Sequence, residues 1–81
     1  MNKICLYGNI NGCSDLAQLL RQTRKAQGLT QIELAAISGV GQRFLSELEN
    51  GKPTLEIGRI LRVAAALGLQ LRLEPRKWVA P

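Results

Sequence analysis

The most informative absence in this sequence is histidine, of which the chain has none. The chain can therefore build neither a histidine general acid or base nor a histidine-ligated metal site. Cysteine is scarce too. The chain has only Cys5 and Cys13, and a four-thiolate zinc site needs a second pair of cysteines. There is no glycine-rich phosphate loop, and Ser46 has no base beside it that would make it a nucleophile. We therefore expect no enzymatic activity, no metal and no cofactor.

Long hydrophobic runs and an export signal are also missing. No stretch reaches 18 apolar residues, so we expect no transmembrane helix and no membrane partner. Residues 1–8 hold one basic residue and an apolar run too short for a signal peptide. We expect a cytoplasmic, reducing location in which Cys5 and Cys13 stay as thiols, with a disulfide between them as the less favoured alternative.

The chain is small and basic. Its 81 residues form one domain, and a core of that size buries only about 60–65% of what the unfolded chain exposes. Without disulfides or metals, association with a second copy is the expected way to complete the core. Eleven Lys and Arg against six Asp and Glu give a net charge of +5, which favours an anionic partner such as nucleic acid.

The middle of the chain, residues 15–68, has the apolar spacing of a helical domain. Asp15 with Gln18 fits a capping box that would begin the first helix, and Thr30 with Glu33 fits a second box. The apolar sides predicted for the third and fourth helices consist of Leu45, Leu48, Leu55, Ile57, Ile60, Leu61, Ala64 and Ala65.

The periodicity changes after residue 68. Residues 69–74 alternate apolar and polar side chains, which predicts a strand with one buried face. A strand needs a hydrogen-bonding partner, and the candidates are residues 3–7 and the same strand in a second copy of the chain. An antiparallel pair of these strands across a twofold axis would bury the apolar side chains of both, so we expect a homodimer. The predicted dimerisation residues are Leu69, Leu71 and Leu73.

The two ends of the chain have little pattern. Residues 1–14 are expected to form an N-terminal arm or short strand, and residues 75–81 form a basic tail. The tail carries Trp78, the single tryptophan. Three roles are open for Trp78: it belongs to a disordered end, it packs on the dimer, or it anchors a partner protein. The third follows from the enrichment of exposed tryptophan at interface hot spots.

Residues 31–50 combine two predicted helices joined by a tight turn over residues 38–41. This is the layout of a helix-turn-helix, whose second helix enters the major groove of DNA. The side chains expected to face outward suit base edges, since arginine pairs with guanine, glutamine with adenine and glutamate with cytosine. Phe44 would either contact a thymine methyl group or complete the core. The base-reading candidates are Gln42, Arg43, Ser46 and Glu47.

Three segments of this region resemble the Xre/Cro-type helix-turn-helix of phage and bacterial repressors. They are Thr30-Gln31-x-Glu33-Leu34-Ala35, Gly39-Val40 and Leu48-Glu49-Asn50-Gly51-Lys52. The resemblance implies an all-α, lambda-repressor-like bundle of four or five helices, here with a short C-terminal β-strand that pairs across a dimer. That strand and the chain length resemble the HipB-type antitoxins of bacterial toxin–antitoxin modules. Such antitoxins are dimers that repress their own operon and bind a kinase-like toxin.

The resemblance also implies roles for individual residues. Gln31 would contact a phosphate and support the recognition helix, where it can also touch Gln42. Arg24 and Glu49 would form a structural ion pair between the first helix and the end of the third. Amides at the helix N-termini can hold phosphates as well. The predicted phosphate contacts are Gln31, Thr30, Gly41, Asn50 and Lys52.

The charge of the chain is unevenly distributed. Residues 29–51 have a net charge of −2, from one arginine against three glutamates, so the basic excess lies on both sides of the motif. We interpret the sequence as a repressor that binds a palindromic operator in double-stranded DNA, and more narrowly as an autoregulating antitoxin. Two alternatives stay open: a phage-type repressor without a toxin partner, and a protein-interaction module in which DNA binding is secondary.

Overall fold

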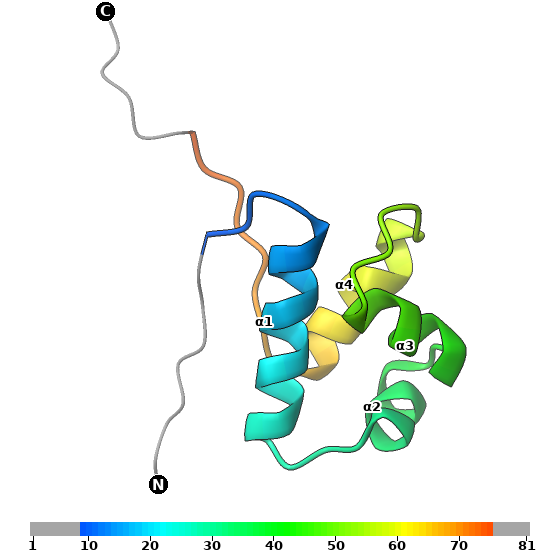
Figure 1. Cartoon of the computed structure of the whole chain (residues 1–81). Helices are drawn as coiled ribbons and strands as arrows, with labels where there is room; N and C mark the ends of the chain where they lie inside the picture. Colours follow the sequence, from blue (N-terminus) through cyan, green and yellow to red (C-terminus); the bar gives the residue numbers. More distant parts are fainter. Residues whose placement is uncertain (1–8, 76–81) are drawn as a thin grey trace, which may run out of the picture.

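The computed structural model describes residues 9–75, which form four α-helices (Figure 1). Helix α2 packs on both α3 and α4, and α1 packs on α3. The all-helical prediction is confirmed. The helices are α1 (Cys13–Ala26), α2 (Gln31–Ser38), α3 (Gln42–Glu49) and α4 (Ile57–Ala66).

Helix α1 begins three residues earlier than the capping-box prediction placed it. Its N-cap is Gly12, which makes no side-chain hydrogen bond. Asp15 lies inside the first turn, where its Oδ2 accepts a hydrogen bond from the Asn11 N–H at 3.0 Å. The predicted box of Asp15 with Gln18 is therefore wrong. A carboxylate within the first turn is still favourable, because it lies near the positive end of the helix dipole.

Helices α2 and α3 are set by local signals that the sequence predicts. The Thr30 Oγ1 accepts from the Glu33 N–H at 3.1 Å, and the Glu33 carboxylate accepts from the Thr30 N–H at 2.8 Å, so this capping box is confirmed. Helix α2 ends at Gly39, whose φ of +74° is the left-handed conformation that glycine adopts without strain. Gly41 is the N-cap of α3 and has no side chain to cap it.

The core lies between all four helices, and it settles the position of Phe44. That side chain is buried, so the alternative in which Phe44 contacts DNA is wrong. The Arg59 guanidinium lies over the Phe44 ring, 5.6 Å from its centroid. The buried cluster consists of Leu20, Leu34, Ala35, Val40, Phe44, Leu45, Leu48, Val63 and Leu67.

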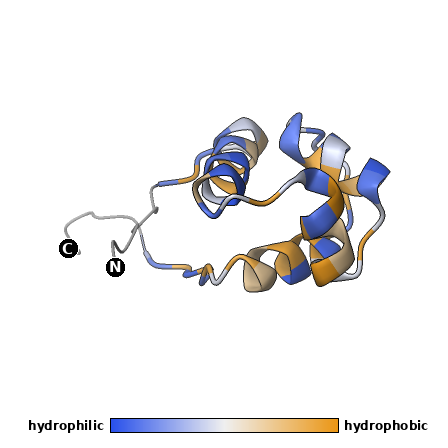
Figure 2. Cartoon of the chain, turned by 90° about the horizontal axis from the view of Figure 1, so that it is seen from below, coloured by the Kyte–Doolittle hydropathy of each residue, from blue (hydrophilic) through white to orange (hydrophobic). Residues whose placement is uncertain are grey.

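The apolar side predicted for α4 is partly wrong. Val63 is fully buried, although it was not among the predicted inward residues, and Ile57, Leu61 and Ala65 are exposed. Most of α4 is hydrophobic in Figure 2, so hydropathy alone left the inward face undetermined. Its packing against α2 selects that face. Among residues 9–75, no helix combines the length and hydrophobicity that crossing a membrane requires.

The segment after α4 forms no strand within the described residues. Leu69 packs against the core, whereas Leu71 is half-exposed and Leu73 is 91% exposed. The single chain offers this segment no β-partner between residues 9 and 75, so the predicted strand is not confirmed. Residues 3–7, Cys5 and Trp78 lie outside the described residues, and Cys13 is exposed at the start of α1.

Candidate nucleic-acid interface

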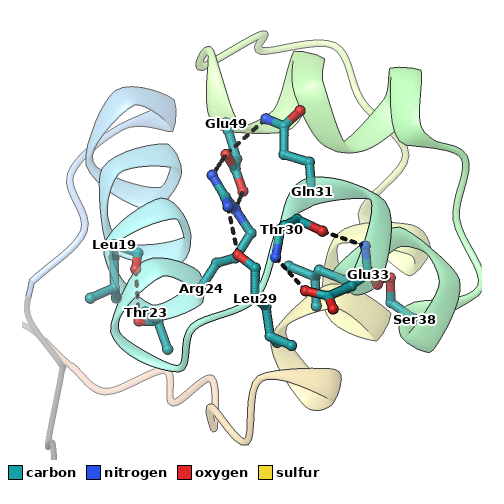
Figure 3. Close-up of polar contacts among 10 residues, drawn as sticks. Leu19, Thr23, Arg24, Leu29, Thr30, Gln31, Glu33, Ser38 and Glu49 are labelled. Carbon is teal, nitrogen blue, oxygen red and sulfur yellow. Dashed lines mark hydrogen bonds and ion pairs between the residues drawn. The ribbon is translucent and has the colours of Figure 1, made fainter.

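The inner side of α3 is held to α1 and α2 by a network of hydrogen bonds centred on Glu49 (Figure 3). Arg24 of α1 donates from Nε to Glu49 Oε2 at 2.7 Å and from Nη2 to Oε1 at 3.0 Å. Its third group, Nη1, donates to the Leu29 carbonyl at 2.8 Å. Gln31, the first residue of α2, donates from Nε2 to Glu49 Oε1 at 3.0 Å. We call Arg24, Leu29, Gln31 and Glu49 the inner network.

The Glu49 carboxylate is ionised in this network despite being buried. Burial by itself raises its pKa, but the hydrogen bonds from Arg24 and Gln31 and the charges of Arg24 and Arg21 outweigh that effect. The net pKa is lower than the usual value of 4.5. A buried ion pair with both carboxylate oxygens bonded fixes the end of α3 relative to the two helices before it.

The outer side of α3 carries the four predicted base-reading residues. Gln42 and Arg43 are exposed in the first turn, and Ser46 and Glu47 are half-exposed one turn later. The Arg43 side chain is 92% exposed. The structure therefore brings these four side chains to one exposed side of a helix whose other side is fixed, which is the arrangement needed to insert α3 into a groove.

A pair of ionic contacts, which no pattern in the sequence predicts, crosses this outer side. The Glu47 Oε2 lies 3.6 Å from Arg43 Nε and 3.4 Å from Lys52 Nζ. Lys52 is held there by its backbone, because its N–H donates to the Glu47 carbonyl at 3.1 Å. Gly51 makes this turn with a φ of +84°.

The residues predicted to contact phosphate lie near the ends of α2 and α3. The Gln31 side chain was expected to touch Gln42, but the hydrogen bond that the structure shows goes to Glu49. No signal in the sequence indicates this contact, because Arg24 alone can bond both oxygens of Glu49. Thr30 and Gly41 are the N-caps of α2 and α3, and Asn50 and Lys52 are exposed just after α3.

Sequence comparison places the chain among known regulators. A helix-turn-helix family model (HTH_3) matches residues 20–73. An uncharacterised HTH-type transcriptional regulator of Sinorhizobium fredii, y4mF, is 48% identical over 58 residues, covering 72% of this chain and 76% of the relative. The putative antitoxin HigA2 of Mycobacterium tuberculosis is 34% identical over 58 residues, covering 70% of this chain and 57% of HigA2. The chain thus matches only a little over half the length of HigA2.

Structural comparison finds the same arrangement of helices in HipB. A chain of the HipB–O4 20mer complex superposes with a TM-score of 0.81 at 27% identity, covering 88% of this chain and 100% of that chain. A chain of the HipA–HipB–O2–O3 complex superposes with the same TM-score, identity and coverage. The four helices of this chain therefore have the HipB fold.

Proposed function

This chain belongs to the helix-turn-helix family of transcriptional regulators, which are not enzymes, and from that premise we propose that it is a sequence-specific repressor. The observation that carries the proposal is the two-sided character of α3. Its inner side is fixed by the buried pair of Arg24 and Glu49, and its outer side presents exposed polar side chains. A rigid helix with a free polar face meets the requirement for reading bases in the major groove.

The division of contacts follows from chemistry. Arg43 donates two hydrogen bonds to a guanine, Gln42 bonds an adenine, and Ser46 and Glu47 contact bases one turn further along. Phosphate contacts position the helix without reading sequence. They come from the N-termini of α2 and α3 and from the segment that follows α3, through Thr30, Gln31, Gly41, Asn50 and Lys52.

We propose that the repressor works as a homodimer on a palindromic operator. Leu71 and Leu73 are exposed in the single chain, and residues 69–74 have the alternating pattern of a strand but form none within residues 9–75. Pairing with the same segment of a second copy would supply its backbone hydrogen bonds and cover these leucines together with Leu69. The two α3 helices would then read half-sites about one helical turn apart.

The narrower proposal is that this chain is the antitoxin of a toxin–antitoxin module in the cytoplasm and represses its own operon. Two comparisons support it: the similarity to the putative antitoxin HigA2, and the match to a chain of a complex that contains both HipA and HipB. The partner would be a kinase-like toxin. An adjacent reading frame whose kinase-like product co-purifies with this chain would support the proposal, and an adjacent product that does not bind would contradict it.

A gel-shift titration tests the repressor proposal. The chain is titrated against the DNA upstream of its own gene and against a scrambled duplex of equal length, at low and moderate salt. We expect a discrete complex on the upstream DNA that survives moderate salt, because base contacts add to the salt-sensitive phosphate contacts. Equal binding to both duplexes, or none, would contradict the proposal.

The dimer proposal has a separate test by light scattering at micromolar concentration. We expect a dimer for the unaltered chain and a monomer for Leu71→Arg, because an arginine in the paired face would bury a charge. Gln70→Arg is the matched control, since it places the same charge on the opposite face of the segment, and it should stay dimeric. A monomeric unaltered chain, or a dimer unaffected by Leu71→Arg, would contradict strand pairing.

A further inference from the structure

Glu47 carries a negative charge in the middle of a face that is proposed to meet DNA, which is itself a polyanion. Its Oε2 lies within 3.6 Å of Arg43 Nε and 3.4 Å of Lys52 Nζ. These two residues are the only cations assigned to base reading and phosphate contact. A single carboxylate oxygen thus offsets part of the charge of both.

The backbone keeps this arrangement in place. The Lys52 N–H donates to the Glu47 carbonyl at 3.1 Å, and the Gly51 N–H donates to the Leu48 carbonyl at 3.1 Å. These two bonds form the Schellman motif that ends α3. Because the turn itself directs residue 52 back toward residue 47, the two side chains stay neighbours whether or not the ion pair forms.

Stability does not account for this pair of contacts. Arg43 is 92% exposed and the contact distances are long, and exposed ion pairs of this kind contribute roughly 0–1 kcal/mol. Within α3, the cation precedes the anion by four residues, which is the weaker orientation for a helical pair. The role of Glu47 is therefore better sought in what α3 contacts than in the fold.

We infer that Glu47 is a specificity-determining residue that suppresses binding to non-operator DNA. The inference rests on the proposed function, in which the outer side of α3 enters the major groove. On arbitrary DNA the contacts are mainly to phosphates, so Glu47 weakens them by pairing with Arg43 and Lys52 and by repelling the backbone. At a site where a cytosine faces Glu47, the carboxylate accepts a hydrogen bond from the cytosine N4 amino group, and Arg43 is released to a guanine.

Discrimination by Glu47 thus has two parts. A matched site gains a base contact, and every other site meets a carboxylate that offsets the charge of Arg43 and Lys52 and repels the phosphates. Raising the free energy of wrong complexes widens the affinity difference even when the right complex gains little. The net charge of −2 over residues 29–51 fits this role, because the motif that reads the bases does not itself attract DNA indiscriminately.

The test is a fluorescence-anisotropy titration of the full chain and its Glu47→Gln variant. Each is titrated against the upstream promoter duplex and a scrambled duplex of equal length, at several salt concentrations. Glutamine keeps the size of the side chain and removes its charge. We expect Glu47→Gln to bind the scrambled duplex more tightly than the unaltered chain, and the ratio of promoter to scrambled affinity to fall by roughly fivefold or more. We also expect a steeper dependence of affinity on salt.

Glu56→Gln is the matched control. Glu56 is also an exposed carboxylate paired with an arginine, Arg59, at 3.0 Å, but it lies outside α3 and outside the segment proposed to pair the dimer. Glu56→Gln should leave the affinity ratio unchanged, and circular dichroism should show both variants folded. An unchanged ratio for Glu47→Gln, or an equal fall for Glu56→Gln, would overturn the inference. An unaltered chain with no promoter preference would instead refute the repressor proposal, and with it this inference, before any variant is compared.

Discussion

Two carboxylates two residues apart on α3 have opposite surroundings, and the difference separates what holds this helix from what it presents. The Glu49 side chain is 3% exposed and accepts three hydrogen bonds, two of them from Arg24 (Figure 3). The Glu47 side chain is 31% exposed and has only long contacts to Arg43 and Lys52. An ion pair counts as structural when it is buried and geometrically complete, and as adjustable when it is exposed and loose.

The inner network and the outer side therefore have different consequences for mutation. Substitutions in the inner network should lower the free energy of unfolding, and they should weaken DNA binding because α3 is then no longer held in place. Changes on the outer side should alter DNA binding and leave folding almost untouched.

The largest expected effect is on the inner side. Arg24→Ala leaves the Glu49 carboxylate buried without its main partner, and losing one member of a buried pair typically costs about 3–5 kcal/mol. Urea denaturation followed by circular dichroism measures the loss. The comparison is Arg43→Ala, which breaks the exposed pair and should change the free energy of unfolding by less than about 0.5 kcal/mol. Equal losses for the two variants would contradict the distinction between the sides.

An intermediate effect is expected on the outer side, in DNA affinity. Arg43→Ala should cost about 1–3 kcal/mol of operator binding and relax the preference at one base pair, since a bidentate guanine contact is lost. Lys52→Ala should weaken binding to all sequences alike and flatten the salt dependence, since a phosphate contact is lost. Anisotropy titrations over single-base operator variants measure both. The same pattern for both variants would contradict the assignment of one cation to a base and the other to phosphate.

The smallest expected effect concerns acid stability. Because the folded-state pKa of Glu49 is lowered, its contribution to stability is present above the ordinary pKa of 4.5 and is lost as the pH falls through the folded value. The unaltered chain should therefore be more stable than Glu49→Gln near neutral pH, and the gap should narrow below pH 4.5. Urea denaturation of both proteins between pH 7 and pH 3 measures the gap. A gap independent of pH would contradict an ionised Glu49 in the network.

The parts of the fold that depend on neighbouring residues could be predicted from the sequence. The capping box of Thr30 and Glu33 and the glycine that ends α2 depend on short-range geometry, and both are in the structure. The box predicted at Asp15 failed because the chain before it already continues the helix to Cys13. The sequence pattern of a capping box therefore marks the start of a helix only where the residues before it are not helical.

Features that depend on packing were less predictable. Helix α4 is apolar along most of its length, so the sequence does not determine which of its residues face the core. In the structure α4 packs against α2, Val63 is buried and Leu61 is exposed. The pairing of Arg24 with Glu49 was expected from family resemblance, whereas the bond from Gln31 to Glu49 was not. The contact of Glu47 with Lys52 depends on the backbone turn at Gly51, and no spacing in the sequence indicates that this turn brings the two residues together.

The outer side of α3 is proposed to read DNA as one half of a symmetric pair. The most direct measurement is a DNase I footprint of the unaltered chain and of Arg43→Ala on the DNA upstream of the gene. We expect two protected half-sites with inverted sequence, about one helical turn apart, and we expect Arg43→Ala to lose this protection or spread it over the duplex. Protection that is absent, covers a single site, or is unchanged by Arg43→Ala would contradict it.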